Sequence, residues 1–313
     1  VCSSAAKGGH LEVLKWLKEV DCLWVDDLCF DETAREGHLE VLKWLRENGC
    51  ELNAGTFSCA VHGGHLEIVK WLHENRCPFN DRAAIGAVSA GRLEVLKWLR
   101  EHGAHWPNRL HNAVAGRHFE VRLPSPPQPT TTTHSTQLIK WAVENGCPVE
   151  GDLCTALAGE GMLDMLKWAR EKGIPWDEDT FSAAARNGDL ALMTWLKENE
   201  CPWSTDTCAS AAFSGPLKTL VWLREKGCPW DEQVLFMAVD AYHVDILKWA
   251  KANGCPCSPK VCVRAIYANK FEMLKWLRAN GFPWDEQVYA TAATLSLQIL
   301  EWLKENGCPG SES

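Results

Sequence analysis

The sequence predicts an all-α fold, a solenoid of about eleven short helical hairpins stacked in a row. First, the phrase Gly-His-Leu-Glu-Val-Leu-Lys-Trp-Leu begins at Gly9, returns at Gly37, and continues in looser copies. Second, each copy contains two segments with helical spacing of apolar residues, separated by a turn. Third, nine of the ten intervals between the repeated tryptophans measure 26 to 28 residues; these are Trp16, Trp44, Trp71, Trp98, Trp141, Trp168, Trp195, Trp222, Trp249, Trp276 and Trp302.

The first helix of each copy is predicted to be short and rich in alanine, as in residues 178–187. Asp177 stands just before this segment, and its carboxylate can accept hydrogen bonds from the unpaired amides of the first turn. Gly188 follows it, and glycine readily adopts the left-handed conformation that ends a helix. In neighbouring copies the place of Asp177 is held by Ser204, Asp231, Ser258 and Asp285.

The second helix is predicted to follow at once, over residues 38–48 in the clearest copy. Its apolar residues cover most of the helix surface and leave only Glu40, Lys43 and Glu47 as a polar stripe. A lone hairpin of two short helices cannot bury so much apolar surface. We therefore expect each hairpin to stack between two neighbours and to share one continuous core with them.

A further tryptophan occurs in the loop that joins one hairpin to the next, and exposed tryptophan is common in binding hot spots. The candidate partner-binding residues are therefore Trp106, Trp176, Trp203, Trp230 and Trp284, and Trp24 holds the same place in the first copy. The alternative is that these rings pack against the next hairpin. We favour packing, because tryptophan side chains are on average heavily buried.

The fifteen cysteines are interpreted as reduced packing residues and not as a disulfide framework. Eight of them share one repeat position, namely Cys22, Cys50, Cys77, Cys147, Cys201, Cys228, Cys255 and Cys308. Ala104, Ile174 and Phe282 hold that position in the remaining copies. A position that accepts Cys, Ala, Ile and Phe is typical of a core, where free cysteine behaves as a small apolar residue.

No catalytic, cofactor-binding or metal-binding residue is assigned from the sequence. Five histidines share one repeat position: His10, His38, His65, His118 and His243. A general base needs convergent partners, whereas a histidine that caps a turn would recur in this way. The closest cysteine group, Cys255 with Cys257 and Cys262, lacks the spacing that structural zinc sites prefer. We therefore expect no enzyme activity, no cofactor and no metal.

Residues 121–137 interrupt the repeat and are rich in proline and threonine, so we expect them to be disordered or extended. Their removal joins Glu120 to Leu138 and restores the repeat phrase. Every valine codon begins with GT and one glutamine codon ends in AG, so our hypothesis is that the segment is a retained intron. The alternative is a tolerated loop insertion.

The predicted domain organisation follows from this interruption. Residues 1–120 hold repeats 1 to 5, of which the first is incomplete. Residues 121–137 are the insertion, and residues 138–313 hold the remainder of repeat 5 and repeats 6 to 11.

The segments Ala184-Ala185-Arg186-Asn187-Gly188 and Gly37 to Gly49 resemble the second half of an ankyrin repeat. An ankyrin repeat has about 33 residues, so the shorter period here implies a β-turn finger that is shortened or absent. Short tryptophan-rich arrays of this kind resemble the ankyrin-like families expanded in large DNA viruses and in algal or other protist hosts. The resemblance implies a protein–protein interaction scaffold that binds through its first helices and the loops between hairpins.

Charge and composition restrict the expected partners. The formal net charge of -9 argues against nucleic acid, which requires a basic surface. No run of apolar residues is long enough for a membrane span. We therefore expect a monomeric, cytoplasmic scaffold for unidentified protein partners.

Two alternative functions stay open at this point. One is a substrate-recruiting adaptor whose effector module lies upstream of Val1, and the other is a thiol or metal-binding protein. The sequence begins inside a repeat, so a targeting signal upstream of Val1 also stays open.

Overall fold

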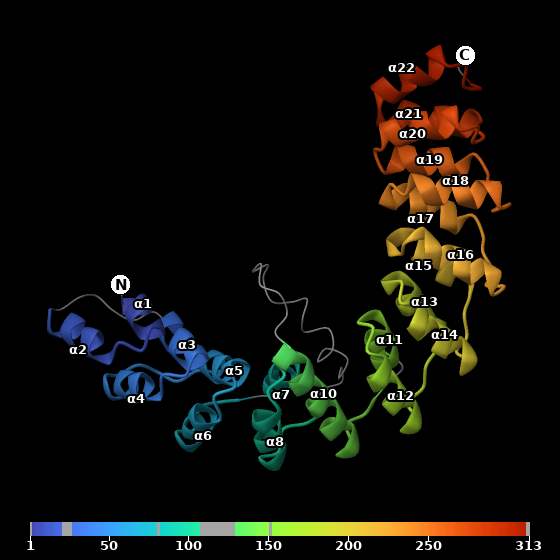
Figure 1. Cartoon of the computed structure of the whole chain (residues 1–313). Coiled ribbons are helices and arrows are strands. Elements are labelled where there is room, and N and C mark those ends of the chain that lie inside the picture. The colour runs from blue at the N-terminus through green and yellow to red at the C-terminus, as the bar shows by residue number, and fades with distance from the viewer. Residues whose placement is uncertain (1, 21–26, 80–81, 107–128, 150–151, 311–313) are drawn as a thin grey trace. The chain divides into compact units, whose positions relative to one another are not determined.

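The computed structural model of the chain describes residues 2–20, 27–79, 82–106, 129–149 and 152–310. These described residues form 21 α-helices and no β-strand (Figure 1). Successive helices pair as hairpins that recur along the chain, so the predicted all-α helical-hairpin repeat fold is confirmed. The chain divides into two compact units, residues 1–153 and 154–313, each with its own stack of hairpins.

The described part of the first unit contains four hairpins and one further helix. α1 pairs with α2, α3 with α4, α5 with α6 and α7 with α8, and α10 carries the repeated tryptophan of a second helix. The bounds are α1 Cys2–Lys7, α2 Leu11–Glu19, α3 Asp27–Glu36, α4 Leu39–Glu47, α5 Ala54–Gly63, α6 Leu66–Glu74, α7 Arg82–Ser89, α8 Leu93–Glu101 and α10 Pro129–Glu144.

The second unit continues the alternation of first and second helices; α11 begins just before the boundary between the units. The bounds are α11 Asp152–Gly159, α12 Leu163–Glu171, α13 Glu178–Asn187, α14 Leu190–Glu198, α15 Thr205–Ser214, α16 Leu217–Glu225, α17 Gln233–Ala241, α18 Val244–Ala252, α19 Lys260–Tyr267, α20 Phe271–Ala279, α21 Glu286–Leu295 and α22 Leu297–Glu305. Connections between hairpins are short. The one from α14 to α15 covers residues 199–204 and contains no strand, as the short period predicts.

The first helix α13, which the sequence predicts over residues 178–187, begins and ends at these residues. Asp177 accepts hydrogen bonds on Oδ1 from the amides of Asp179 and Thr180, at 3.1 and 3.2 Å. These bonds satisfy amides that have no partner inside the helix. Gly188 ends α13 in the left-handed conformation, with a φ of 73°. At the end of α17, Tyr242 adopts the same conformation with a φ of 64°, so the turn is kept without glycine.

The first helices pack directly against one another within a unit. In the second unit α13, α15, α17, α19 and α21 lie side by side in that order (Figure 1). Fully buried alanines such as Ala184 and Ala211 allow this close approach. A hydrogen bond between hydroxyl groups adds to it, because Ser182 Oγ of α13 and Thr207 Oγ1 of α15 are 3.1 Å apart.

The second helices supply larger apolar side chains to the core. α14, for example, buries Leu192, Met193 and Leu196 completely. Second helices of neighbouring hairpins pack less closely against one another than first helices do. Larger side chains therefore fill the space between them. In the described part of the chain, no helix combines the length and the apolar composition that crossing a membrane requires.

The repeat position shared by Cys, Ala, Ile and Phe is buried, which confirms its interpretation as a packing position. Each described residue at this position is at most 6% exposed: Cys50, Cys77, Ala104, Cys147, Ile174, Cys201, Cys228, Cys255, Phe282 and Cys308. Cys22 lies outside the described residues. Some of these thiols also close the base of a hairpin. Cys77 Sγ donates to the carbonyl oxygen of Asn53 at 3.2 Å, and Cys201 Sγ to that of Asp177 at 3.5 Å. Each acceptor residue precedes the first helix of the same hairpin, so the bond joins the two ends of that hairpin.

Side chains in the turn of one hairpin reach back to the hairpin before it. His65 Nε2 lies 2.8 Å from the carbonyl oxygen of Arg35, and Arg92 donates to the carbonyl oxygen of His62 at 3.0 Å. His38 makes the same kind of contact with the first hairpin. These carbonyl groups lie in the last turn of a first helix, where backbone acceptors lack helical partners. His38, His65 and His243, which contacts the carbonyl oxygen of Ala212, therefore have a structural role between hairpins.

The predicted insertion at 121–137 falls partly outside the described residues. Residues 121–128 are not described, and α10 begins at Pro129 and includes residues 129–137, which the composition predicts to be disordered or extended. From Leu138 onward α10 behaves as an ordinary second helix, since Leu138 and Ile139 are fully buried. The assignment of 121–137 as an insertion stays a prediction.

Candidate protein-binding surface

The loop tryptophans that the sequence offers as binding residues are half-buried and pack against other aromatic rings. The rings of Trp176 and Trp195, from successive hairpins, meet edge to face with centres 5.6 Å apart. Trp230 meets Trp249 in the same way at 5.8 Å. The remaining three contacts join Trp106 to Trp141 at 5.6 Å, Trp203 to Phe181 at 5.1 Å, and Trp284 to Trp302 at 6.0 Å.

A cation from the preceding second helix lies over the face of each of these loop tryptophans. The Arg170 guanidinium is 4.1 Å from the ring centre of Trp176, and its Nη1 donates to the carbonyl oxygen of Ile174 at 2.7 Å. The other pairs are Arg100 over Trp106, Lys197 over Trp203, Arg224 over Trp230 and Arg278 over Trp284. Such cation–π contacts are attractive and occupy ring surface that a partner would need. The geometry favours the packing role; Trp24 lies outside the described residues.

Burial keeps the core thiols protonated. It raises the pKa from the ordinary 9.0 to about 11 for Cys77, Cys147, Cys154 and Cys308, and to about 12 for Cys201, Cys255 and Cys262. Only the thiolate is a nucleophile or a metal ligand. Within the described ranges, no group of three or more His, Cys, Asp or Glu residues is placed to hold a metal ion.

The cysteine group closest in sequence is engaged in hairpin contacts. Cys255 and Cys262 are buried, whereas Cys257 is half-buried. Cys255 Sγ donates to the carbonyl oxygen of Asp231, and Cys262 Sγ to that of Pro283, both at 3.3 Å. Two of the three thiols thus have backbone acceptors, which supports core packing over a metal site.

Exposed aromatic residues gather on the solvent side of the first helices in the second unit. Phe213 of α15 is 47% exposed and Tyr267 of α19 is 67% exposed. Phe236 and Met237 of α17 are half-buried. Because α15, α17 and α19 pack in this order, the four side chains contribute to one surface, which we call the aromatic face.

The aromatic face is not among the binding residues expected from the sequence, although the repeat contains a signal for it. Phe213 and Tyr267 hold the same repeat position, which Arg186, Asp240 and Thr294 hold in the other copies of the second unit. This position changes its chemistry from copy to copy, unlike the tryptophan of the second helix. Such variation on an exposed side of a helix is typical of a surface that is not needed for packing.

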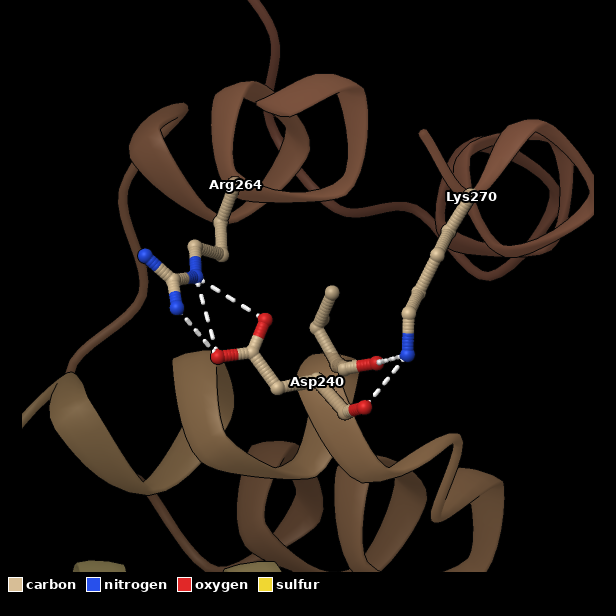
Figure 2. Close-up of polar contacts among 4 residues, drawn as sticks. Asp240, Arg264 and Lys270 are labelled. Carbon is tan, nitrogen blue, oxygen red and sulfur yellow. Dashed lines mark hydrogen bonds and ion pairs between the residues drawn. The ribbon is translucent and has the colours of Figure 1, made fainter. Parts of the chain in front are cut away.

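An ion pair lies in the middle of the aromatic face. Figure 2 shows Asp240 of α17 facing Arg264 of α19, whose Nε donates to Oδ1 and Oδ2 of Asp240 at 2.9 and 3.1 Å, while Nη2 donates to Oδ2. Lys270, just before α20, donates to the carbonyl oxygens of Asp240 and Val239. The carboxylate and the guanidinium compensate each other, and the ammonium group of Lys270 adds one positive charge beside them. These bonds also hold α17 to the next hairpin.

Comparison with protein families finds a match inside the first unit. The family described as "Ankyrin repeats (3 copies)" fits residues 30–109, from within α3 to beyond the end of α8. In this range the chain matches ankyrin repeats. The ankyrin segment contains the buried cysteine position and the turn contacts of His65 and Arg92 described above. No curated protein matches the chain in sequence.

Solved structures similar to the chain are longer helical-repeat proteins. The pentatricopeptide repeat protein PPR10 in complex with an 18-nt psaJ RNA element is 13% identical, with a TM-score of 0.45, over 98% of this chain and 53% of that chain. PPR10 from maize is 14% identical, with a TM-score of 0.39, over 98% and 54%. The chain thus spans about half the length of the solved structures it matches. At this identity the likeness concerns the helical-repeat fold alone.

Proposed function

We propose that the chain is a non-enzymatic protein-binding scaffold and that its partner binds on the aromatic face of the second unit. The observation that carries this proposal is the exposure of Phe213 and Tyr267 on first helices that are otherwise closely packed. Exposed apolar patches with polar surroundings mark interaction sites. Aromatic residues and arginine are also enriched at binding hot spots. The ankyrin repeats in residues 30–109 support a scaffold function.

In this proposal the loop tryptophans serve packing and the first helices serve binding. A half-buried ring such as Trp176, held between Trp195 and Arg170, has little free surface to offer. The side chain of Tyr267, by contrast, is mostly exposed and contributes little to the core. A partner could therefore cover the aromatic face without disturbing the stack of hairpins.

We further propose that all the hairpins form one array of short, tryptophan-rich ankyrin-like repeats, of the kind expanded in large DNA viruses and in algal or other protist hosts. The support is that the contacts of the ankyrin segment recur outside it. The bond from Cys77 to the carbonyl oxygen of Asn53 lies in the ankyrin segment, and the bond from Cys201 to that of Asp177 repeats it in the second unit.

The array is interrupted in this proposal by residues 121–137, which we infer to be a retained intron. The support is that their removal restores the repeat phrase at Glu120 and Leu138. Sequencing of the mature transcript tests it. Absence of these codons is the expected result, and their uniform presence would show instead that the protein carries a loop insertion.

Affinity capture with variants of the whole chain tests the binding function. The baits are the unchanged chain, the double variant Phe213→Ala/Tyr267→Ala, and the control Trp16→Ala. Trp16 lies on α2 and is 58% exposed, so the control removes an exposed aromatic ring from a surface outside the aromatic face. Circular dichroism verifies that all three chains are equally helical.

We expect the unchanged chain and the control to retain the same specific proteins. The double variant should retain them about tenfold less or worse, because truncation of hot-spot residues costs about 2 kcal/mol or more. Equal retention by all three chains would refute the assignment of the aromatic face. Turnover of a substrate by the purified chain would refute the scaffold function itself.

A further inference from the structure

We propose that the aromatic face binds a peptide segment that combines apolar anchor side chains with lysine or arginine at one end. This inference rests on the proposed function and adds the chemistry of the partner. The charges that border the face support it. The apolar anchors would cover Phe213, Phe236, Met237 and Tyr267, and the basic end would lie over the first turns of α13 and α15, which carry Asp179 and Asp206.

Two carboxylates border the aromatic face on its α13 and α15 side. Asp206 precedes Phe213 by seven residues on α15, which is two helical turns, so both side chains lie on one side of the helix, about 10 Å apart along it. Asp179 holds the same repeat position on α13. Both aspartates are exposed, and neither has an ion-pair partner among the described residues.

The same repeat position changes its charge along the second unit. It is Asp179 on α13, Asp206 on α15, Gln233 on α17 and Lys260 on α19, and all four residues are exposed. At this position the negative charge lies on α13 and α15 and the positive charge on α19. Arg186, which holds the Phe213 position on α13, is an exposed cation two turns after Asp179. A bound segment gains most when its cations lie over the first turns of α13 and α15, close to Asp179 and Asp206 and away from Arg186.

The centre of the face favours apolar over basic groups on the partner. Asp240 and Arg264 are bonded to each other by the guanidinium fork, so neither attracts a further charge strongly. A lysine or arginine of the partner placed there would lose water and be repelled by Lys270, which lies beside the pair. The exposed rings of Phe213 and Tyr267 on either side favour aliphatic or aromatic anchors instead.

Selection from a library of random linear peptides displayed on phage, against the whole chain, tests the inference. The most enriched peptide is synthesised with a fluorescent label and titrated by fluorescence anisotropy. The titrations use the unchanged chain, Phe213→Ala, Asp206→Lys and Lys260→Glu. The last two variants reverse one exposed charge at the same repeat position, and circular dichroism monitors the helicity of each.

We expect the enriched peptides to share apolar residues followed or preceded by lysine or arginine. Phe213→Ala should weaken binding about tenfold or more. Asp206→Lys should weaken it about two- to fivefold, in line with an exposed ion pair, and more strongly at low than at high salt. Lys260→Glu should leave binding of the basic peptide equal or tighter.

The outcomes separate this inference from the function on which it rests. Enrichment of acidic or uncharged peptides would refute a basic partner. So would binding that Phe213→Ala abolishes and Asp206→Lys leaves unchanged. Either result would still support the aromatic face as the binding surface. Failure to enrich any peptide whose binding depends on Phe213 would overturn the inference as well. In the affinity capture described above, equal retention of proteins by the unchanged chain and by the Phe213→Ala/Tyr267→Ala variant would refute the aromatic face as the binding surface.

Discussion

Replacement of Gly188 by alanine tests how closely neighbouring hairpins approach each other. Gly188 ends α13 with a φ of 73°, and a Cβ atom added there would lie 2.8 Å from Cδ of Pro216 and 3.3 Å from Oγ1 of Thr219. Pro216 precedes α16 in the next hairpin, and its ring has no rotamer that moves Cδ away. The added methyl group must therefore push the two hairpins apart.

The size of the effect follows from two separate costs. An alanine in the left-handed conformation costs about 1 to 2 kcal/mol relative to glycine. The forced contact with Pro216 adds about 1 to 3 kcal/mol, as overpacking of a close-packed site does. Gly173→Ala is the matched control, because Gly173 has a φ of 76° and no atom lies within 4 Å of its Cβ position. The control therefore incurs the first cost without the second.

Urea unfolding followed by circular dichroism measures both variants against the unchanged chain. We expect Gly188→Ala to lose about 1 to 3 kcal/mol more stability than Gly173→Ala. Equal losses in the two variants would show that the hairpins are not held together as tightly as the contact between Gly188 and Pro216 implies.

Three further predictions concern the core and its edges. Arg224→Ala uncovers the Trp230 ring and should cost about 1 to 2 kcal/mol in thermal unfolding, whereas exposed Lys226→Ala should cost less than about 0.5 kcal/mol. Because burial raises the pKa of Cys201 from 9.0 to about 12, the unfolded thiol ionises first; its contribution to stability should be constant below pH 9 and fall between pH 9 and 12. Denaturation of the unchanged chain and Cys201→Ala across this range checks the sign, and a rise in stability would contradict it. Hydrogen exchange should be slowest over residues 168–249, and uniform protection along the chain would refute that expectation.

The repeat architecture could be predicted because packing imposes the same residue types in every copy. Asp177 is an N-cap in sequence and in structure, since its carboxylate satisfies the amides of Asp179 and Thr180. The cysteine position could be recognised as core because Phe282 or Ala104 can replace cysteine there. In each case a local physical requirement determines the residue type, so the sequence pattern reveals it.

The candidate surface could not be predicted in the same way. The distance from Arg170 to the ring of Trp176 depends on how the chain turns after α12, and the sequence alone does not give that geometry. Phe213 and Tyr267 were missed because an isolated aromatic residue in a helix is usually part of the core. Their exposure depends on how α15, α17 and α19 are oriented against one another, which follows from side-chain packing across hairpins.

Hydrogen–deuterium exchange of the whole chain with and without a bound peptide tests whether a partner binds on the aromatic face. We expect a peptide selected on the chain to add protection on α15, α17 and α19, and to leave the loops that carry Trp176, Trp230 and Trp284 unchanged. Added protection in those loops, with no change on the three first helices, would contradict it and would return the binding role to the tryptophans.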